Sequence, residues 1–307
     1  MGAPARTLFF GSGTFALPAL EALIAAPSVD VVGVITAPPR PSGRKGALAS
    51  TPVASAAERA AVDVSTPSRL RDADTLAALA AKKPALIVLA DYGRLVPQAV
   101  LDLPEHGALN LHPSLLPRHR GATPVPAAIL AGDTETGVTL MRMDAGLDTG
   151  PIIAQRSRAL DGAEVAPELE ATLAVDGAEL LAETLEAWIA GEVPAVPQVE
   201  SDATLTRPLR RPDGLLDPMA GAAALERQVR AYQPWPGSFI EGPDGRLIVW
   251  RADALAEGAH PGRPGDVIAD GDGVALRTDD GRLRLVEVQP AGRKRMSGAD
   301  YRRGQRS

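Results

Sequence analysis

Cysteine is absent from this 307-residue sequence, which excludes disulfide bonds, thiolate nucleophiles and cysteine-ligated metals. Its absence also fits the reducing cytoplasm, where we expect the protein to reside. Histidine is scarce, and the histidines do not show the clustered spacing with acids that a metal site requires. We therefore expect no metal cofactor. The histidines are His106, His112, His119 and His260.

Long hydrophobic runs are missing too, and no segment approaches the length of a membrane span. The hydrophobic content of 45% is nevertheless that of an ordinary folded, soluble protein. We therefore expect no membrane partner. A chain of 307 residues is longer than one compact core usually absorbs, which predicts two domains.

Acidic residues outnumber basic ones, and the net charge is −6. This excess argues mildly against a nucleic-acid partner, because phosphate binding needs local positive charge. Basic residues nevertheless gather locally: six stand against one acid between residues 292 and 307, and smaller groups lie in 40–45 and 207–211. Taken alone, each group is best interpreted as a solvated surface.

Strand-like and helix-like segments alternate through the first half of the chain. Continuous apolar segments predict strands that are buried on both faces. Their alternation with helical patterns predicts a Rossmann-like, doubly wound α/β domain with a mostly parallel sheet. The expected strands are 7–10, 29–35, 84–90 and 108–112, and further apolar runs lie at 137–141 and 152–154. The expected helices are 15–26, 52–61, 72–82, 96–101 and 167–190, and 38–46 is expected as a loop.

A break in the pattern at 191–197, which contains two prolines, separates this half from a different kind of sequence. Beyond it, one helix is expected at 220–231, followed by short strands split by glycines. That spacing predicts a small β-barrel or sandwich. The short strands are 246–250, 265–269, 273–278 and 282–289. We therefore expect an α/β domain over 1–191, a linker over 192–207 and a β domain over 208–307.

The strand expected at 108–112 ends abruptly at polar residues. Asn110 and His112 are two positions apart, so on a strand their side chains share one face. A carboxylate loop, 144–150, contains Asp148. A carboxamide, an imidazole and a carboxylate held together can hydrogen-bond a developing oxyanion and manage an amine proton, which is the chemistry of acyl transfer to nitrogen. The alternative is that Asp148 only closes a turn between its neighbouring glycines.

A glycine turn near the start fits the dinucleotide-binding pattern G-x-G-x-x-A at Gly11–Ala16. That pattern also expects an acidic residue near the end of the second strand, where it holds the ribose. Here 34–38 reads Val-Ile-Thr-Ala-Pro and contains no acid. We therefore interpret the turn as a tight connection without a nucleotide.

Two segments together resemble the signatures of formyltransferases that use 10-formyltetrahydrofolate: 110–124, which begins Asn-Leu-His-Pro-Ser-Leu-Leu-Pro, and 144–150, Asp-Ala-Gly-Leu-Asp-Thr-Gly. Members that formylate methionyl-tRNA share more of the chain. The loop 39–46, the stretch Ala-Tyr-Gln-Pro-Trp-Pro at 231–236 and 289–296 are similar to theirs. The resemblance runs from about Leu8 to Asp300.

The resemblance implies a role for each matching residue and an OB-like C-terminal barrel that binds tRNA. It implies 10-formyltetrahydrofolate as co-substrate, methionyl initiator tRNA as partner, and a monomer without metal or nucleotide. The implied catalytic residues are Asn110, His112 and Asp148. The folate-binding residues are Ser114, Leu115, Leu116 and Pro117, to which we add Tyr92 and Gly93 because they follow a strand of the same sheet. The implied tRNA-binding residues are Arg40, Arg44, Lys45, Arg293, Lys294 and Arg295.

Four positions depart from the pattern of these relatives, at Ser12, Asp91, Pro113 and His119. None of the four removes a catalytic group. Three rival functions stay open at this point. They are a formyl-folate enzyme acting on a small amine (a glycinamide ribonucleotide or an amino sugar), a nicotinamide oxidoreductase, and a non-catalytic RNA-binding protein.

Overall fold

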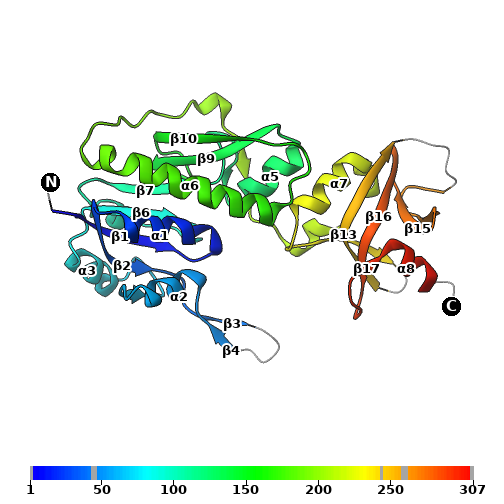
Figure 1. Ribbon diagram of the computed structural model, residues 1–307, viewed down its shortest axis with the longest axis horizontal. Helices are drawn as coiled ribbons and strands as arrows, with labels where there is room; N and C mark the ends of the chain where they lie inside the picture. The colour runs from blue at the N-terminus through cyan, green and yellow to red at the C-terminus, as the bar shows by residue number, and fades with distance from the viewer. Residues whose placement is uncertain (1–2, 43–46, 243–244, 257–261, 305–307) are drawn as a thin grey trace. The chain divides into compact units, whose positions relative to one another are not determined.

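The computed structural model describes residues 3–42, 47–242, 245–256 and 262–304 (Figure 1). The chain divides into two compact units. Unit 1 comprises Met1–Pro124, Glu135–Ala159 and Glu170–Thr206, and unit 2 comprises Val125–Thr134, Leu160–Leu169 and Arg207–Ser307. In the part of the chain that the structure describes, no helix is long and apolar enough to cross a bilayer.

Unit 1 is built on a seven-stranded sheet in the order β10-β9-β7-β6-β1-β2-β5. The five strands from β7 to β5 run parallel, whereas β9 and β10 are antiparallel to their neighbours. The expectation of an α/β fold with a mostly parallel sheet is therefore confirmed. The strands are β1 (Ala5–Gly11), β2 (Val29–Ile35), β5 (Val64–Ser65), β6 (Leu86–Ala90), β7 (Ala108–His112), β9 (Glu135–Arg142) and β10 (Ile152–Ala159).

The helices that accompany this sheet follow the expected apolar patterns closely. One of them, α2, begins where the side chain of Thr51 accepts a hydrogen bond from the backbone of Ala54, which satisfies a free amide of the first turn. They are η1 (Thr14–Ala16), α1 (Leu17–Ala25), α2 (Pro52–Arg59), α3 (Ala73–Ala81), α4 (Gln98–Leu101) and α6 (Ala166–Ile189), the last spanning both units. A further helix, α5 (Pro124–Ala131), belongs to unit 2 except for its first residue and was not anticipated.

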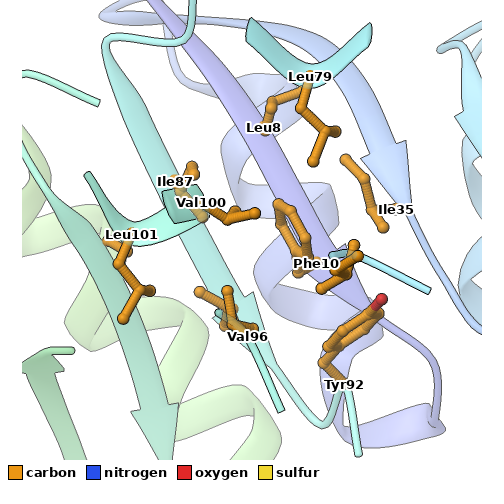
Figure 2. Packing of buried hydrophobic residues seen from close by; sticks show 12 residues of the cluster. Leu8, Phe10, Ile35, Leu79, Ile87, Tyr92, Val96, Val100 and Leu101 are labelled. Carbon is orange, nitrogen blue, oxygen red and sulfur yellow. The ribbon is translucent and has the colours of Figure 1, made fainter. Parts of the chain in front are cut away.

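A buried cluster on one face of the sheet joins β1, β6 and the helices that cover them (Figure 2). Within it, the rings of Phe10 and Tyr92 meet edge to face, with their centroids 5.3 Å apart. All five residues of β6 are buried, as a strand covered on both faces requires. This core fixes the carboxyl ends of β1, β6 and β7 at one edge of the sheet.

The expectation of a plain loop over 38–46 is wrong. Two short strands, β3 (Arg40–Ser42) and β4 (Ala47–Ala49), pair into a hairpin that extends from the sheet (Figure 1). Its described side chains are exposed, so no apolar pattern announces it. The expected linker, 192–207, contains η2 (Glu200–Asp202) and β11 (Leu205–Thr206), and β11 pairs with β8 (Arg120–Gly121) in unit 1.

Unit 2 contains the expected β domain, a six-stranded sheet in the order β12-β13-β16-β15-β14 with β17 paired to β16. The described strands form an open path, with no pairing between β12 and β14, so they do not close the barrel that was expected. The strands are β12 (Ser238–Gly242), β13 (Gly245–Ala256), β14 (Val267–Asp270), β15 (Gly273–Arg277), β16 (Gly281–Pro290) and β17 (Met296–Ser297). The helices are η3 (Arg211–Gly214), η4 (Pro218–Ala220), α7 (Ala222–Ala231) and α8 (Gly298–Gly304).

Candidate active site

His112 is the last residue of β7 and lies almost entirely inside unit 1, with 4% of the residue exposed. Its Nε2 atom lies 3.0 Å from the carbonyl oxygen of His119. A carbonyl can only accept, so Nε2 carries the hydrogen and Nδ1 of the neutral ring keeps its lone pair. Burial lowers the pKa of His112, while the carboxylate of Asp148 opposes that shift.

Asp148 supplies the carboxylate that faces this imidazole. One of its oxygens, Oδ2, lies 3.7 Å from Nδ1 of His112 and accepts a 2.8 Å hydrogen bond from the backbone of Gly121. The structure thus brings together two residues that sequence spacing alone could not join. Asp144 closes the glycine turn instead, since its side chain accepts from Gly146 at 2.9 Å and from Thr149 at 2.7 Å.

Asn110 lies two residues before His112 on the same strand, opposite Met141 of β9. It is half-buried, and none of the described residues forms a hydrogen bond with its carboxamide. Its two N–H donors are therefore available to a ligand. Because alternate side chains of a strand share a face, the carboxamide and the imidazole lie on one side of the sheet.

Side chains of β9 and β10 hold the loop Ser114–Pro117, which follows β7, through hydrogen bonds to its backbone. Thr139 accepts a hydrogen bond from the backbone of Leu116 at 3.0 Å and donates to the carbonyl of Ser114 at 2.7 Å. Gln155 donates to the carbonyl of Leu116 at 2.9 Å. Ser114 and Leu116 are themselves buried, whereas Leu115 and Pro117 are half-buried. The loop is thus rigid, and some of its side chains face inward.

Tyr92 and Gly93 follow β6 at the same edge of the sheet. The side chain of Tyr92 belongs to the buried cluster of Figure 2 and is 4% exposed, so it does not line an open crevice. Gly93 is exposed and has a φ of +69°, which favours glycine. Of these two residues, only Gly93 and the backbone of Tyr92 are available to contact a ligand.

The glycine turn after β1 is closed by Asp91. The backbone N–H groups of Ser12 and Gly13 both donate to the carbonyl of Asp91, at 3.0 and 3.4 Å. A Cβ atom on Gly13 would overlap the Asp91 carboxylate. Asp91 as a whole is exposed, but desolvation of its carboxyl group against the turn, with a smaller contribution from Glu170, raises its pKa to about 6. The amides of Ser12 and Gly13 are therefore occupied, and the Asp91 carboxylate fills the space beside Gly13 that a pyrophosphate would need.

The predicted tRNA contacts lie in two places. Arg40 is exposed on β3, while Arg44 and Lys45 lie outside the described residues. Arg293, Lys294 and Arg295 are exposed in the turn between β16 and β17, where the guanidinium of Arg295 stacks 3.4 Å above the ring of Trp250. Among the residues described, no group of three or more histidines and acids is arranged to hold a metal ion.

Sequence reasoning missed one functional neighbour of this site, the segment between residues 196 and 206. Gln198 donates hydrogen bonds to the backbone of the Asp148 loop, and Thr204 accepts one from the backbone of His119. A glutamine and a threonine in a proline-containing stretch carry no signal that could have identified them.

Comparisons with known proteins find formyltransferases along nearly the whole chain. Two family models match: Formyl transferase over residues 5–185, and Formyl transferase, C-terminal domain, over residues 208–306. Methionyl-tRNA formyltransferase of Roseiflexus sp. (strain RS-1) is 44% identical, covering 99% of this chain and 93% of the relative. That of Chloroflexus aurantiacus (strain ATCC 29366 / DSM 635 / J-10-fl) is 45% identical, covering 97% and 96%. The solved structure of HypX from Aquifex aeolicus in complex with tetrahydrofolic acid has a TM-score of 0.62, covering 97% of this chain and 46% of that chain. At 19% identity, this likeness shows the fold alone.

Proposed function

This chain belongs to the formyl transferase family, and from that membership we propose that it transfers the formyl group of 10-formyltetrahydrofolate to the α-amine of methionyl initiator tRNA. The formylated product serves translation initiation. Relatives named methionyl-tRNA formyltransferase match both the N-terminal and the C-terminal part of the chain. These relatives are 44% and 45% identical over nearly the full chain, so the tRNA substrate is favoured over a small amine.

The observation that carries the proposal is a buried imidazole that faces a carboxylate next to a carboxamide with free donors. His112 and Asp148 are 3.7 Å apart, and Asn110 lies on the same strand as His112. A ring whose Nδ1 lone pair points at a carboxylate is able to take up a proton, because the carboxylate stabilises the resulting imidazolium. An amide with free N–H groups is able to stabilise negative charge on oxygen.

In the proposed reaction, a bond forms between the methionine amine and the formyl carbon, and the bond from that carbon to the folate nitrogen breaks. Asn110 donates a hydrogen bond to the formyl oxygen as that oxygen gains negative charge. His112 accepts the proton that the amine loses, and Asp148 stabilises the charged ring. His112 then gives this proton to the departing nitrogen, which returns the ring to its neutral form.

10-Formyltetrahydrofolate supplies the activated formyl group as a co-substrate. The donor set at this edge fits such a molecule, since it offers an amide donor and a proton acceptor without any cysteine nucleophile. We assign folate contacts to Gly93, Leu115 and Pro117 through side chain or backbone. The buried Tyr92, Ser114 and Leu116 contribute through their backbone only.

We assign tRNA contacts to the basic residues of the hairpin and of the β domain, and we propose that the β domain is OB-like. Arg293 and Lys294 are exposed, as phosphate contacts require, and Arg40 presents a further cation on the hairpin. Arg44 and Lys45 are assigned to the acceptor end with Arg40. We propose domain boundaries at 1–191, 192–207 and 208–307, and we propose that the protein is a cytoplasmic monomer.

The test is the transfer of a labelled formyl group from 10-formyltetrahydrofolate to methionyl initiator tRNA. We expect formyl-methionyl-tRNA to accumulate with the wild-type protein and not with a His112→Ala variant. Methionyl elongator tRNA, free methionine, glycinamide ribonucleotide and an amino sugar nucleotide serve as competing acceptors. Faster transfer to a small amine than to the initiator tRNA would replace the tRNA substrate, and no transfer to any acceptor would overturn the proposal.

A further inference from the structure

A strap formed by residues 196–206 lies along unit 1 and supports both loops of the candidate site. At its start, the backbones of Val196 and Ile152 exchange two hydrogen bonds of 2.8 and 2.7 Å. At its end, β11 pairs in parallel with β8. Between them, the hydroxyl of Thr204 accepts a 2.7 Å hydrogen bond from the backbone of His119. The strap is thus tied at several points along its length.

Gln198 is a residue of the strap whose side chain contacts both the Asp148 loop and β8. Its Nε2 atom donates to the carbonyl oxygens of Asp148 and Gly150, at 2.8 and 2.7 Å. Its Oε1 atom accepts a 3.0 Å hydrogen bond from Nε of Arg120. One carboxamide therefore joins the loop that carries Asp148 to the strand β8.

Each of the joined segments touches the imidazole–carboxylate pair directly. On the β8 side, Gly121 donates to the Asp148 carboxylate and the carbonyl of His119 accepts from His112. On the other side, Asp148 has a φ of +53°, in the left-handed region that is costly for a residue with a Cβ. A tie on its carbonyl oxygen holds the residue in that conformation.

The neighbouring Arg120 has a different role. Its guanidinium is buried, and its two terminal nitrogens form a paired contact with the carboxylate of Glu200, at 3.1 and 2.9 Å. In the described part of the chain, the Arg120 side chain forms no hydrogen bond with the Asp148 loop, so its link to that loop passes through Gln198.

We propose that Gln198 is a positioning residue that sets the distance and orientation of Asp148 relative to His112. The inference rests on the proposed function for its kinetic consequence, but not for its geometric one. Without the tie, the Asp148 loop is free to relax its left-handed residue and to turn the carboxylate away from the imidazole. A misplacement of about 1 Å in such a site can lower a rate about 100-fold.

Two variants separate the parts of this tie. Gln198→Met keeps the length of the side chain and removes all its hydrogen bonds. Gln198→Glu keeps an acceptor for Arg120 but turns the donor to the two carbonyl oxygens into a further acceptor. We expect kcat of both variants to fall by about 10- to 100-fold, with KM for folate and for tRNA close to wild type.

The matched control is Gln228→Met in unit 2. The Gln228 amide also bridges two backbone carbonyl oxygens, those of Asp213 and Leu215, at 3.3 and 3.2 Å. This control separates a general loss of stability from a loss of positioning, and we expect it to keep the wild-type kcat. Thermal unfolding of all three variants shows whether each is folded at the assay temperature.

A second readout needs no substrate. Asp148 and His119 are the titratable groups that face His112 in the described structure. The carboxylate of Asp148 raises the pKa of His112, as does the hydrogen bond to the backbone carbonyl of His119, whereas the His119 ring lowers it. If Gln198 holds the carboxylate in place, the Gln198 variants titrate His112 at a lower pH than wild type. The imidazole NMR signals resolve this, because the chain has four histidines and His112→Asn assigns one of them.

A wild-type kcat together with an unchanged His112 titration in folded Gln198→Met would overturn the proposal. So would a raised KM with unchanged kcat, which would make Gln198 a binding residue, or an equal loss of kcat in Gln228→Met. If the wild-type protein forms no formyl-methionyl-tRNA, the proposed function fails, while the NMR titration still decides whether Gln198 positions the pair.

Discussion

The Nδ1 atom of His112 lies 3.7 Å from a carboxylate oxygen of Asp148, while the Nε2 atom of the same ring donates to a backbone carbonyl. The second contact fixes the proton on Nε2, so the lone pair on Nδ1 faces the carboxylate. This arrangement is unfavourable for the neutral ring, whose lone pair faces a negative oxygen, and favourable for the charged one. A ring so placed is suited to accept a proton during a reaction and to return it afterwards.

Asp148→Asn tests the electrostatic half of this pair. Burial lowers the pKa of His112 and Asp148 opposes that shift, so removing the carboxylate lowers the pKa further. Because His112 must be neutral to accept the amine proton, the acidic limb of the kcat profile moves to lower pH. We also expect the maximal rate to fall by roughly 10²- to 10⁴-fold. Single-turnover rates between pH 5 and 8 measure both effects, and a limb that moved to higher pH would contradict the assignment.

Asn110→Ala removes an amide that has no hydrogen-bond partner among the described residues. The half-buried site loses little packing, so we expect the unfolding free energy to stay close to wild type. The rate should nevertheless fall about 10²- to 10³-fold, as for the loss of an oxyanion donor. Single-turnover kinetics and urea unfolding of the same preparation provide the measurement. A stable variant that kept the wild-type rate would remove Asn110 from the reaction.

Asp91→Asn is expected to stabilise the protein at neutral pH. The folded-state pKa of about 6 lies above the ordinary value of 3.8, so the folded state keeps its proton while the unfolded state loses it. The contribution of this carboxyl group to the unfolding free energy of the wild type is fully present below about pH 4 and is lost as the pH rises through about 6. Asparagine does not titrate, and it tolerates the left-handed backbone at this position, where φ is +44°.

The unfolding free energy of Asp91→Asn relative to wild type should therefore rise between about pH 4 and pH 7. Asp272→Asn, in the exposed turn between β14 and β15, is the control substitution. An Asp91→Asn variant whose difference from wild type did not change with pH would show that the carboxyl group is not shifted.

The glycine turn at Gly11–Gly13 should not bind a dinucleotide. Its amides are already occupied by the carbonyl of Asp91, and an acidic side chain fills the space beside Gly13. Fluorescence titration with reduced nicotinamide nucleotides is expected to show no saturable site. Micromolar binding that disappears in a Gly13→Val variant would instead favour an oxidoreductase.

The exposed turn after β16 should account for part of the salt dependence of tRNA binding. Neutralising Arg293 and Lys294 to glutamine should weaken binding and reduce the log–log salt slope by about one unit for each phosphate that is no longer neutralised. Arg295 is left intact because it stacks on Trp250. The control replaces the exposed Arg69 and Arg71 of unit 1 with glutamine. If both double variants kept the wild-type slope, the turn would not contact tRNA.

The parts of the fold that sequence patterns predicted are those in which burial decides the residue types. The buried run of β6 and the long helix α6 both follow from apolar patterning alone. The hairpin β3–β4 was not predicted because its described side chains are exposed and leave no apolar pattern. Helix α5 begins with prolines at positions 124 and 126, which suggest a turn when no partner is in view.

The site was predictable where its chemistry is concentrated on one strand and not where it depends on distant contacts. Asn110 and His112 share a strand, so their common face follows from its geometry. The meeting of His112 with Asp148 depends on how β9 and the Asp148 loop fold back onto β7, which spacing does not encode. Tyr92 was assigned to a ligand pocket because it ends a strand, but its ring is needed in the core.

The strap also determines when the candidate site becomes complete during synthesis. Gln198 contacts a loop 50 residues earlier, and Thr204 contacts a residue 85 positions earlier. Such long-range contacts form late, because the chain between them must first be ordered. A nascent chain that has emerged only to residue 191 contains Asn110, His112 and Asp148 but lacks the strap. We expect it to gain full activity only after residue 206 has left the ribosome, so that a folded but unfinished chain does not act on the pool of charged initiator tRNA.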